Sequence, residues 1–283
     1  MPTKPLPYTV VDVFTDRPLQ GNQLGVFTDA AALTGEQMQR LAREMNFAEC
    51  TFLLPPAQGG DARLRIFTPA QELPFAGHPV LGTAFVVGEA LGKDAVRLET
   101  GNGVVPLELT REGGRVVYGR MQQPIPSWSA YPQEAALLAA LGVSRSLLPV
   151  ETYQNGPLHA YVALASEDEV ARLKPDLAAL AALGHVGANC FAGAGARWKT
   201  RMFGPGLGVP EDPATGSAAG PLCVHLARHG RIAFGDEIEI RQGEEIGRPS
   251  TLFARAQGSA RKIDRVEVGG SAVVVARGEF VRW

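Results

Sequence analysis

The chain has 283 residues, of which 45% are hydrophobic, and its formal net charge is −2. Since a domain commonly takes about 100–200 residues, this is enough for one large domain or two modest ones. The evenly mixed charges argue against a nucleic-acid-binding or membrane-surface protein. No apolar run reaches the length of a membrane span and the polar start is no signal peptide, so we expect a cytoplasmic protein.

Three cysteines occur, Cys50, Cys190 and Cys223, and none of them forms a C-x-x-C pair. An odd number without such spacing excludes a disulfide framework and a zinc knuckle. Free cysteine is commonly buried, so we expect each to be a small core residue.

The first half of the chain predicts short strands around two helices. Thr34 and Gln37 have the form of a capping box, and Asn46 is a suitable left-handed end for the helix that follows. Residues 80–91 are apolar nearly all round, which is typical of a buried helix, and Gly92 would end it. Strands are expected over residues 8–14, 24–27, 47–54, 62–67, 96–99 and 104–109.

The second half begins after residues 122–132, a Pro-rich stretch that predicts a linker between the halves. A helix is expected over residues 134–141 and a hairpin turn at Asn155-Gly156. Ser166 has the spacing to Glu169 of a helix cap, and residues 187–192 are expected to form a strand.

An internal repeat links the two halves. Arg65-Ile66-Phe67-Thr68-Pro69 is echoed by Arg201-Met202-Phe203-Gly204-Pro205. An acid-bearing loop follows each, then a small-residue helix start, Gly77-His78 or Gly216-Ser217. The repeat predicts two similar α/β lobes, each with strands around a buried helix. We divide them at residues 1–123, completed by the last C-terminal strand, and 124–283.

Small residues where a helix begins leave backbone N–H groups open to an anion. Four polar side chains lie in or near these helix starts or in the strands before them. Glu49 is set in apolar surroundings, so desolvation would raise its pKa, as suits an acid/base group. His78 could donate a hydrogen bond or move a proton, and Ser217 could hold a carboxylate. Each residue, Asp212 included, also has a structural interpretation, as a solvated or paired acid or as a helix cap.

Other chemistries find little support. The chain lacks G-x-S-x-G, S-x-x-K, G-x-x-x-x-G-K-[ST] and G-x-G-x-x-G. His225 and His229 share a helical face, yet no glutamate completes H-E-x-x-H, so a packed or solvated pair is expected.

Five stretches of the chain form a recognisable set. They are Gly21-Asn22, Glu49-Cys50-Thr51-Phe52, Arg65-Ile66-Phe67-Thr68-Pro69, Glu72-Leu73-Pro74-Phe75-Ala76-Gly77-His78-Pro79 and Glu211-Asp212-Pro213-Ala214-Thr215-Gly216-Ser217-Ala218. In this order and at this spacing, they resemble the PhzF family of phenazine biosynthesis-like proteins. The resemblance extends nearly end to end and is most marked toward the isomerases of phenazine biosynthesis.

The resemblance implies an α+β fold of the diaminopimelate-epimerase type, with two pseudo-symmetric lobes and an active site in the cleft between them. It also implies a homodimeric, cofactor-free isomerase acting on trans-2,3-dihydro-3-hydroxyanthranilate, with no nucleic-acid or membrane partner and no metal. Glu49 would be the catalytic acid/base, assisted by His78 and Asp212. The implied substrate-binding residues are Asn22, Gly77, Gly216 and Ser217.

Two departures from the family leave the substrate open. Ala48 and Cys50 flank Glu49 where the family has hydroxyl residues, and Gln23 replaces a common proline. A two-thiol racemase or epimerase would need a cysteine at each helix start. An isomerase of another small carboxylate and a non-catalytic binding protein are the remaining alternatives.

Overall fold

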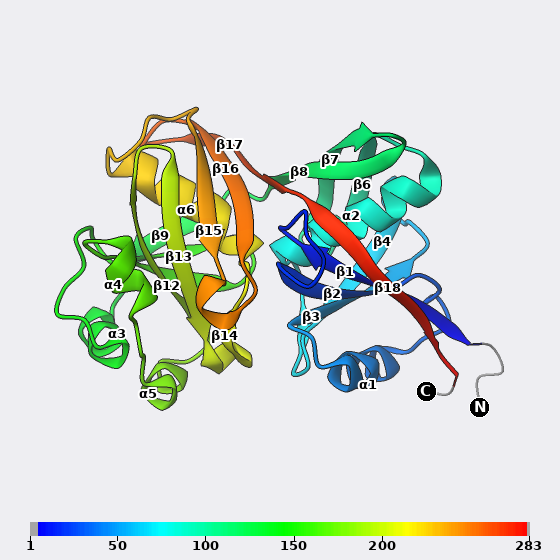
Figure 1. Ribbon diagram of the computed structural model, residues 1–283, viewed down its shortest axis with the longest axis horizontal. Helices are drawn as coiled ribbons and strands as arrows, with labels where there is room; N and C mark the ends of the chain where they lie inside the picture. The colour runs from blue at the N-terminus through cyan, green and yellow to red at the C-terminus, as the bar shows by residue number, and fades with distance from the viewer. Residues whose placement is uncertain (1–4, 282–283) are drawn as a thin grey trace. The chain divides into compact units, whose positions relative to one another are not determined.

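Two runs of strands with the same order of pairings make up the fold. The structure is a computed structural model that describes residues 5–281. One compact unit consists of residues 5–122 with residues 269–281, and the other of residues 123–268. In Figure 1 the first unit is drawn from blue to green with the red C-terminal strand. Within residues 5–281, no helix has both the length and the apolar character that crossing a membrane requires.

The first unit contains two helices, α1 (Gly35–Met45) and α2 (Gly77–Leu91). Its last strand pairs antiparallel with its first, so the chain returns to the unit in which it began. Figure 1 shows these two strands, β1 and β18, side by side. The strands are β1 (Leu6–Val13), β2 (Asn22–Phe27), β3 (Glu49–Leu54), β4 (Ala62–Phe67), β5 (Glu72–Leu73), β6 (Ala95–Thr100), β7 (Gly103–Glu112), β8 (Arg115–Gln123) and β18 (Ala272–Phe280).

The second unit is built around α6 (Gly216–Arg228), with the shorter helices α3 (Glu134–Leu141), α4 (Glu167–Ala171) and α5 (Leu177–Ala182). Two 3₁₀ turns, η1 (Pro205–Leu207) and η2 (Glu244–Ile246), complete it. The strands are β9 (Ser127–Ala130), β10 (Glu151–Gln154), β11 (Leu158–Ala163), β12 (Val186–Ala194), β13 (Arg197–Gly204), β14 (Val209–Asp212), β15 (Glu237–Gln242), β16 (Ser250–Gly258) and β17 (Ile263–Gly270).

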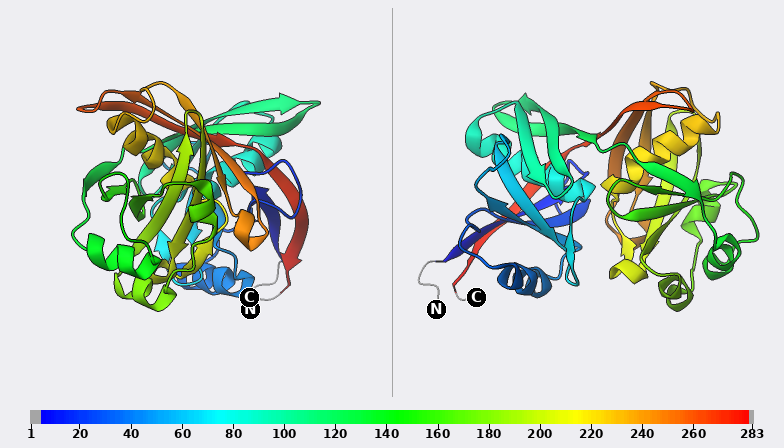
Figure 2. Two further views of the ribbon diagram at one scale, coloured as in Figure 1. Left: turned by 60° about the vertical axis from the view of Figure 1, so that its left-hand side comes forward. Right: turned by 180° about the vertical axis from the view of Figure 1, so that it is seen from behind.

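The strand pairings repeat from one unit to the other. In the first unit β2 and β3 pair parallel, β3 and β4 antiparallel, β4 and β6 parallel, and β6 and β7 antiparallel. In the second unit β11, β12, β13, β15 and β16 follow the same sequence of directions. The long helix also has the same place in the order of elements along the chain, since α2 directly precedes β6 and α6 directly precedes β15. Both helices can be followed by their colours in Figure 2. The expected pseudo-symmetric fold is therefore confirmed.

An arginine–glutamate pair occupies the same place in each half of the repeat. Arg65 donates Nε and Nη2 to the two carboxylate oxygens of Glu72, at 2.7 and 2.6 Å. Arg201 donates in the same way to Glu211, at 2.8 Å for both bonds. Each guanidinium also lies over the aromatic ring two residues ahead, Phe67 or Phe203, at 5.1 and 4.8 Å from its centroid. The repeat therefore extends from the backbone to side-chain contacts.

Both long helices are buried on nearly every side, as their all-round apolar sequences predict. Small residues let the strands come close to them. A Cβ atom on Gly82 of α2 would lie 2.6 Å from Cγ2 of Val13 and 2.7 Å from Cδ2 of Leu24. Only glycine fits there without displacing the side chains of Val13 and Leu24.

Most local signals are confirmed. Thr34 and Gln37 form a reciprocal capping box, and Asn46 ends α1 in the left-handed region with φ of 51°. The helix over residues 134–141 is α3, and β10 and β11 form a hairpin around residues 155–156. Ser166 accepts a hydrogen bond from the backbone N–H of Glu169 at the start of α4.

One prediction was wrong in part. Residues 122–132 were expected to be a linker, yet Ser127–Ala130 forms β9 and pairs antiparallel with β10. The prolines explain the error. Pro124 and Pro126 precede this strand and Pro132 follows it, so the proline content of the stretch concealed four residues free to form ladder hydrogen bonds.

Candidate functional site

Asn22, Glu49 and His78 meet at the start of α2. His78 is the second residue of that helix and its side chain is buried. Its Nδ1 lies 3.2 Å from Nδ2 of Asn22, the first residue of β2. Its Nε2 lies 3.5 Å from Oε2 of Glu49, the first residue of β3. We call Asn22, Glu49, Gly77 and His78 the N-terminal group.

The His78 ring is neutral at physiological pH. Burial lowers its pKa from the usual 6.5 to about 3, although a backbone hydrogen bond with Gln23 opposes this shift. The Glu49 side chain is 14% exposed, with its Oε2 atom buried. The Glu49 carboxyl therefore faces the neutral His78 ring at the first turn of the buried helix α2.

The N-termini of both long helices lack a side-chain cap from the N-cap residue. Ala76 precedes α2 and Thr215 precedes α6, and neither side chain accepts a hydrogen bond from the first turn. The first residues, Gly77 and Gly216, bring no side chain of their own. A helix start of this kind presents backbone N–H groups and the positive end of the helix dipole, and both favour a bound anion.

Asp212, Gly216 and Ser217 lie in the second unit, before and within the start of α6, and we call them the C-terminal group. Asp212 ends β14, is buried, and accepts a hydrogen bond of 2.7 Å from the hydroxyl of Thr215. Gln242 of β15 joins this group, since its Nε2 donates to the Asp212 carbonyl at 2.8 Å and to Thr215 Oγ1 at 2.9 Å. These bonds fix the turn that leads into α6.

Side chains from neighbouring strands also hold the first turn of α6. Gln123 donates to the Gly216 carbonyl at 2.8 Å, and the Tyr161 hydroxyl donates to the Ala218 carbonyl at 2.8 Å. Between them, Ser217 Oγ lies 3.0 Å from Nε2 of the buried His159. The sequence analysis did not identify His159 or Gln123, because neither belongs to a local motif. The alternation along β11, which turns His159 and Tyr161 toward the same face, could have indicated His159 but not Gln123, which ends β8.

The three thiols are structural. Cys50, Cys190 and Cys223 are buried, as expected, and burial raises the pKa of each to about 12. None of them is at the helix starts, which Gly77-His78 and Gly216-Ser217 occupy. A mechanism that moves protons between two thiols therefore has no groups to carry it here.

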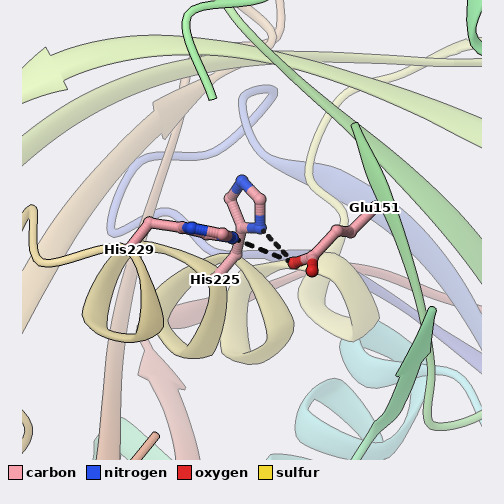
Figure 3. A group of neighbouring side chains, drawn as sticks. All are labelled: Glu151, His225 and His229. Atoms are coloured by element: carbon pink, nitrogen blue, oxygen red, sulfur yellow. Dashed lines mark hydrogen bonds and ion pairs between the residues drawn. The ribbon is translucent and has the colours of Figure 1, made fainter. Parts of the chain in front are cut away.

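A third polar group lies at the other end of α6 and joins Glu151, His225 and His229 (Figure 3). Glu151 Oε2 lies 3.2 Å from His225 Nδ1 and 3.1 Å from His229 Nε2. The expectation of a merely packed or solvated histidine pair missed this acid, which comes from β10 and not from the helix.

The same carboxylate oxygen accepts a hydrogen bond of 2.7 Å from Arg228 and one of 2.8 Å from the Tyr153 hydroxyl. Burial opposes ionisation of Glu151, but these four donors together hold its pKa well below its usual range. The guanidinium already supplies positive charge at this oxygen, where a metal ion would have to bind. The group is therefore a network of charged hydrogen bonds that joins the end of α6 to β10. Its arginine agrees with the preference of helix C-termini for cations.

The sequence matches a known protein family over nearly its whole length. The model of the PhzC-PhzF family, described as phenazine biosynthesis-like proteins, matches residues 11–278. The chain is 54% identical over 271 residues to the trans-2,3-dihydro-3-hydroxyanthranilate isomerase of Pseudomonas aeruginosa, covering 96% of this chain and 98% of that protein.

Solved structures show the same fold. The chain resembles a predicted epimerase from Pseudomonas aeruginosa with a TM-score of 0.83 and 33% identity, covering 98% of this chain and all of that one. A probable proline racemase from Agrobacterium radiobacter superposes with a TM-score of 0.68 at 14% identity, over 97% and 92% of the two chains, and so shares the fold alone. With the match over nearly all its length, the chain belongs to the PhzF family of phenazine biosynthesis-like proteins.

Proposed function

We propose that this protein is an isomerase of phenazine biosynthesis that converts trans-2,3-dihydro-3-hydroxyanthranilate to its amino-ketone. The observation that carries the proposal is the contact between Glu49 and neutral, buried His78 at an uncapped helix start. The 54% identity to an isomerase named for this substrate supports the same conclusion.

The reaction moves one hydrogen between two carbons of the ring. Glu49 takes the proton from the carbon that bears the hydroxyl, and the released C–H pair forms a new C=C bond. The π pair displaced by this new bond moves one position along the ring, and the second π pair takes a proton from Glu49 at the carboxylate-bearing carbon, so two ring C=C bonds remain. The resulting enol tautomerises to the ketone. No electrons are gained or lost, so the reaction needs no redox cofactor.

The remaining residues of the N-terminal group and of the C-terminal group would bind and orient the substrate. The backbone N–H groups at Gly77, Gly216 and Ser217 would hold the carboxylate, since helix starts favour anions. Asp212 and His78 would orient the amine and the hydroxyl. Asn22 would set the His78 ring, whose Nδ1 it contacts.

Purified protein, incubated with trans-2,3-dihydro-3-hydroxyanthranilate, tests the proposal through the decay of the diene absorbance. Glu49→Gln keeps the size of the side chain but cannot accept the proton, so we expect it to lower kcat by on the order of 10²–10⁴-fold. Full turnover by Glu49→Gln would refute the acid/base role. An inactive wild type would refute the substrate, and turnover of another small carboxylate would then favour the alternative that Ala48 and Cys50 beside Glu49 leave open.

The resemblance also implies a cytoplasmic homodimer, and this stays a prediction. Sedimentation equilibrium should give twice the chain mass of 30.0 kDa. A mass of one chain at micromolar concentration would contradict it.

A further inference from the structure

The side chain of Asn189 fixes the direction of a hydrogen-bond chain that ends at Ser217. Nδ2 of Asn189 lies 3.1 Å from the backbone carbonyl oxygen of Gly187 and 3.2 Å from Nδ1 of His159. A carbonyl oxygen only accepts hydrogen bonds, so the amide NH₂ group must face Gly187. Its second hydrogen then points at Nδ1 of His159, which must be the acceptor.

This arrangement selects one tautomer of His159. A neutral imidazole carries one N–H, and with Nδ1 accepting, the hydrogen is on Nε2. The ring is 1% exposed, and burial lowers its pKa to about 4, so it stays neutral at physiological pH. Nε2–H therefore donates to Ser217 Oγ, 3.0 Å away.

Ser217 keeps its own hydroxyl hydrogen for another partner. Its Oγ accepts from His159, and among residues 5–281 the hydroxyl makes no other hydrogen bond. The carbonyls on either side, of Gly216 and Ala218, are already taken by Gln123 and Tyr161. The hydroxyl thus lies at the uncapped start of α6, together with the backbone N–H groups there.

We propose that His159, oriented by Asn189, is a positioning residue that fixes the Ser217 hydroxyl as a hydrogen-bond donor to the substrate carboxylate. The same direction of bonding means that His159 cannot act as a base toward Ser217, because its Nε2 already carries a hydrogen. The inference rests on the proposed function for the identity of the substrate. The direction of the bond rests on the second unit alone.

The tautomer can be measured without any substrate. Long-range ¹H–¹⁵N spectra of protein labelled at its five histidines report which ring nitrogen carries the hydrogen in each. The His159 signals are assigned by their loss in His159→Gln. We expect the Nε2–H tautomer at pH 7 in the wild type, and a mixture in Asn189→Leu. An Nδ1–H tautomer in the wild type would overturn the inference.

Binding tests the consequence for the carboxylate. Anthranilate carries the same adjacent amine and carboxylate on a planar ring, and calorimetry gives its dissociation constant. We expect Ser217→Ala and His159→Phe each to weaken its binding by about tenfold, a typical loss for a hydrogen bond to a charged group. Because both act through one hydrogen bond, the double variant should bind no more weakly than Ser217→Ala.

Two controls separate positioning from a structural effect. Exposed His185→Gln should leave anthranilate binding unchanged. In the isomerase assay, His159→Phe should raise KM by about tenfold while lowering kcat less than about threefold, whereas His159→Gln should recover part of the loss because its amide can donate to Ser217. Multiplied losses in the double variant, or unchanged binding in His159→Phe, would overturn the inference.

The outcomes for the two proposals are distinct. If the wild type does not convert the dihydro-hydroxyanthranilate, the proposed function fails, while the tautomer and anthranilate measurements still decide the role of His159. If the wild type is active but anthranilate binding is absent or indifferent to Ser217→Ala, only the carboxylate contact fails.

Discussion

Nε2 of His78 lies 3.5 Å from Oε2 of Glu49, and the ring is buried at the start of α2. Burial keeps this ring uncharged, so it lies beside the carboxyl without adding a counter-charge. In the proposed reaction, this leaves Glu49 as the group whose protonation changes during turnover and makes His78 an orienting partner.

His78→Gln should therefore separate the two roles. We expect kcat to fall on the order of 10²-fold, because a misplaced partner loosens the alignment of the proton transfer. The acidic limb of the pH–rate profile should keep its apparent pKa, since His78 does not titrate near neutral pH. If the limb disappears in His78→Gln, then the ring itself carries the titrating proton.

Two buried neutral histidines should make stability depend on pH. His78 and His159 have folded-state pKa values lowered to about 3 and about 4, so below pH 6.5 the unfolded chain binds more protons than the folded one. The free energy of unfolding is therefore unaffected by these two rings above pH 6.5. As the pH falls from 6.5 toward the folded pKa of each histidine, that histidine should lower the free energy of unfolding by about 1.4 kcal/mol per pH unit.

Urea unfolding at pH 7, 6 and 5 tests this, since this range lies above the usual pKa of most carboxyls. His78→Gln and His159→Gln should each flatten the dependence by the share of one histidine. A free energy of unfolding that does not fall from pH 6.5 to pH 5 would contradict the burial of neutral rings.

The repeated arginines should differ in what they contribute to stability. Arg201 is 8% exposed, and besides Glu211 its Nη1 donates to the carbonyls of Val170, Ala171 and Leu173. Arg201→Leu leaves these acceptors buried without their hydrogen-bond donor, and it should lower the free energy of unfolding by about 3–5 kcal/mol. The matched variant Arg65→Leu removes a pair that is 32% and 41% exposed, and should cost about 1 kcal/mol or less. Equal losses in thermal or urea unfolding would show that burial does not set the difference.

Position 220 should require glycine, because the side chain of Gln123, which holds the start of α6, leaves no room there for a Cβ atom. A Cβ atom there would lie 2.4 Å from Oε1 of Gln123 and 2.6 Å from Cγ1 of Val266. Gly220→Ala should therefore destabilise the protein by about 1–3 kcal/mol, although alanine favours helices more than glycine.

A double-mutant cycle identifies the clash. Gln123→Ala removes the obstructing side chain, so the double variant should be more stable than the sum of the two single losses predicts. Strict additivity in urea unfolding would locate the clash elsewhere.

The group of Glu151, His225 and His229 at the end of α6 should gain little stability from zinc. Glu151 already accepts from Arg228, whose charge opposes a second cation at that oxygen. Excess zinc should leave the Tm of the wild type unchanged, while Arg228→Gln should allow a rise that His229→Ala in the same background removes. A zinc-dependent rise in the wild type would show that the arginine gives way to the metal.

Much of this fold could be predicted from sequence, because its signals are local or periodic. The capping box of Thr34 and the apolar course of residues 80–91 each lie within a few turns of chain. The repeat of Arg65 by Arg201 was visible as residue spacing, and the structure shows the same paired contacts in both units. The prediction of a linker over residues 122–132 was wrong in part, since the prolines flank β9 and do not exclude a strand between them.

The sequence by itself determined the family, the two-lobed fold and the importance of Glu49, His78, Asp212 and Ser217 as candidates, because motifs and their spacing carry that information. Only the tertiary structure decided which partners these groups meet. His159 reaches Ser217 across 58 positions, and Glu151 reaches His225 across 74. Such contacts depend on the register in which strands pair and on the side of a helix that they cover, and no local pattern of residues encodes either.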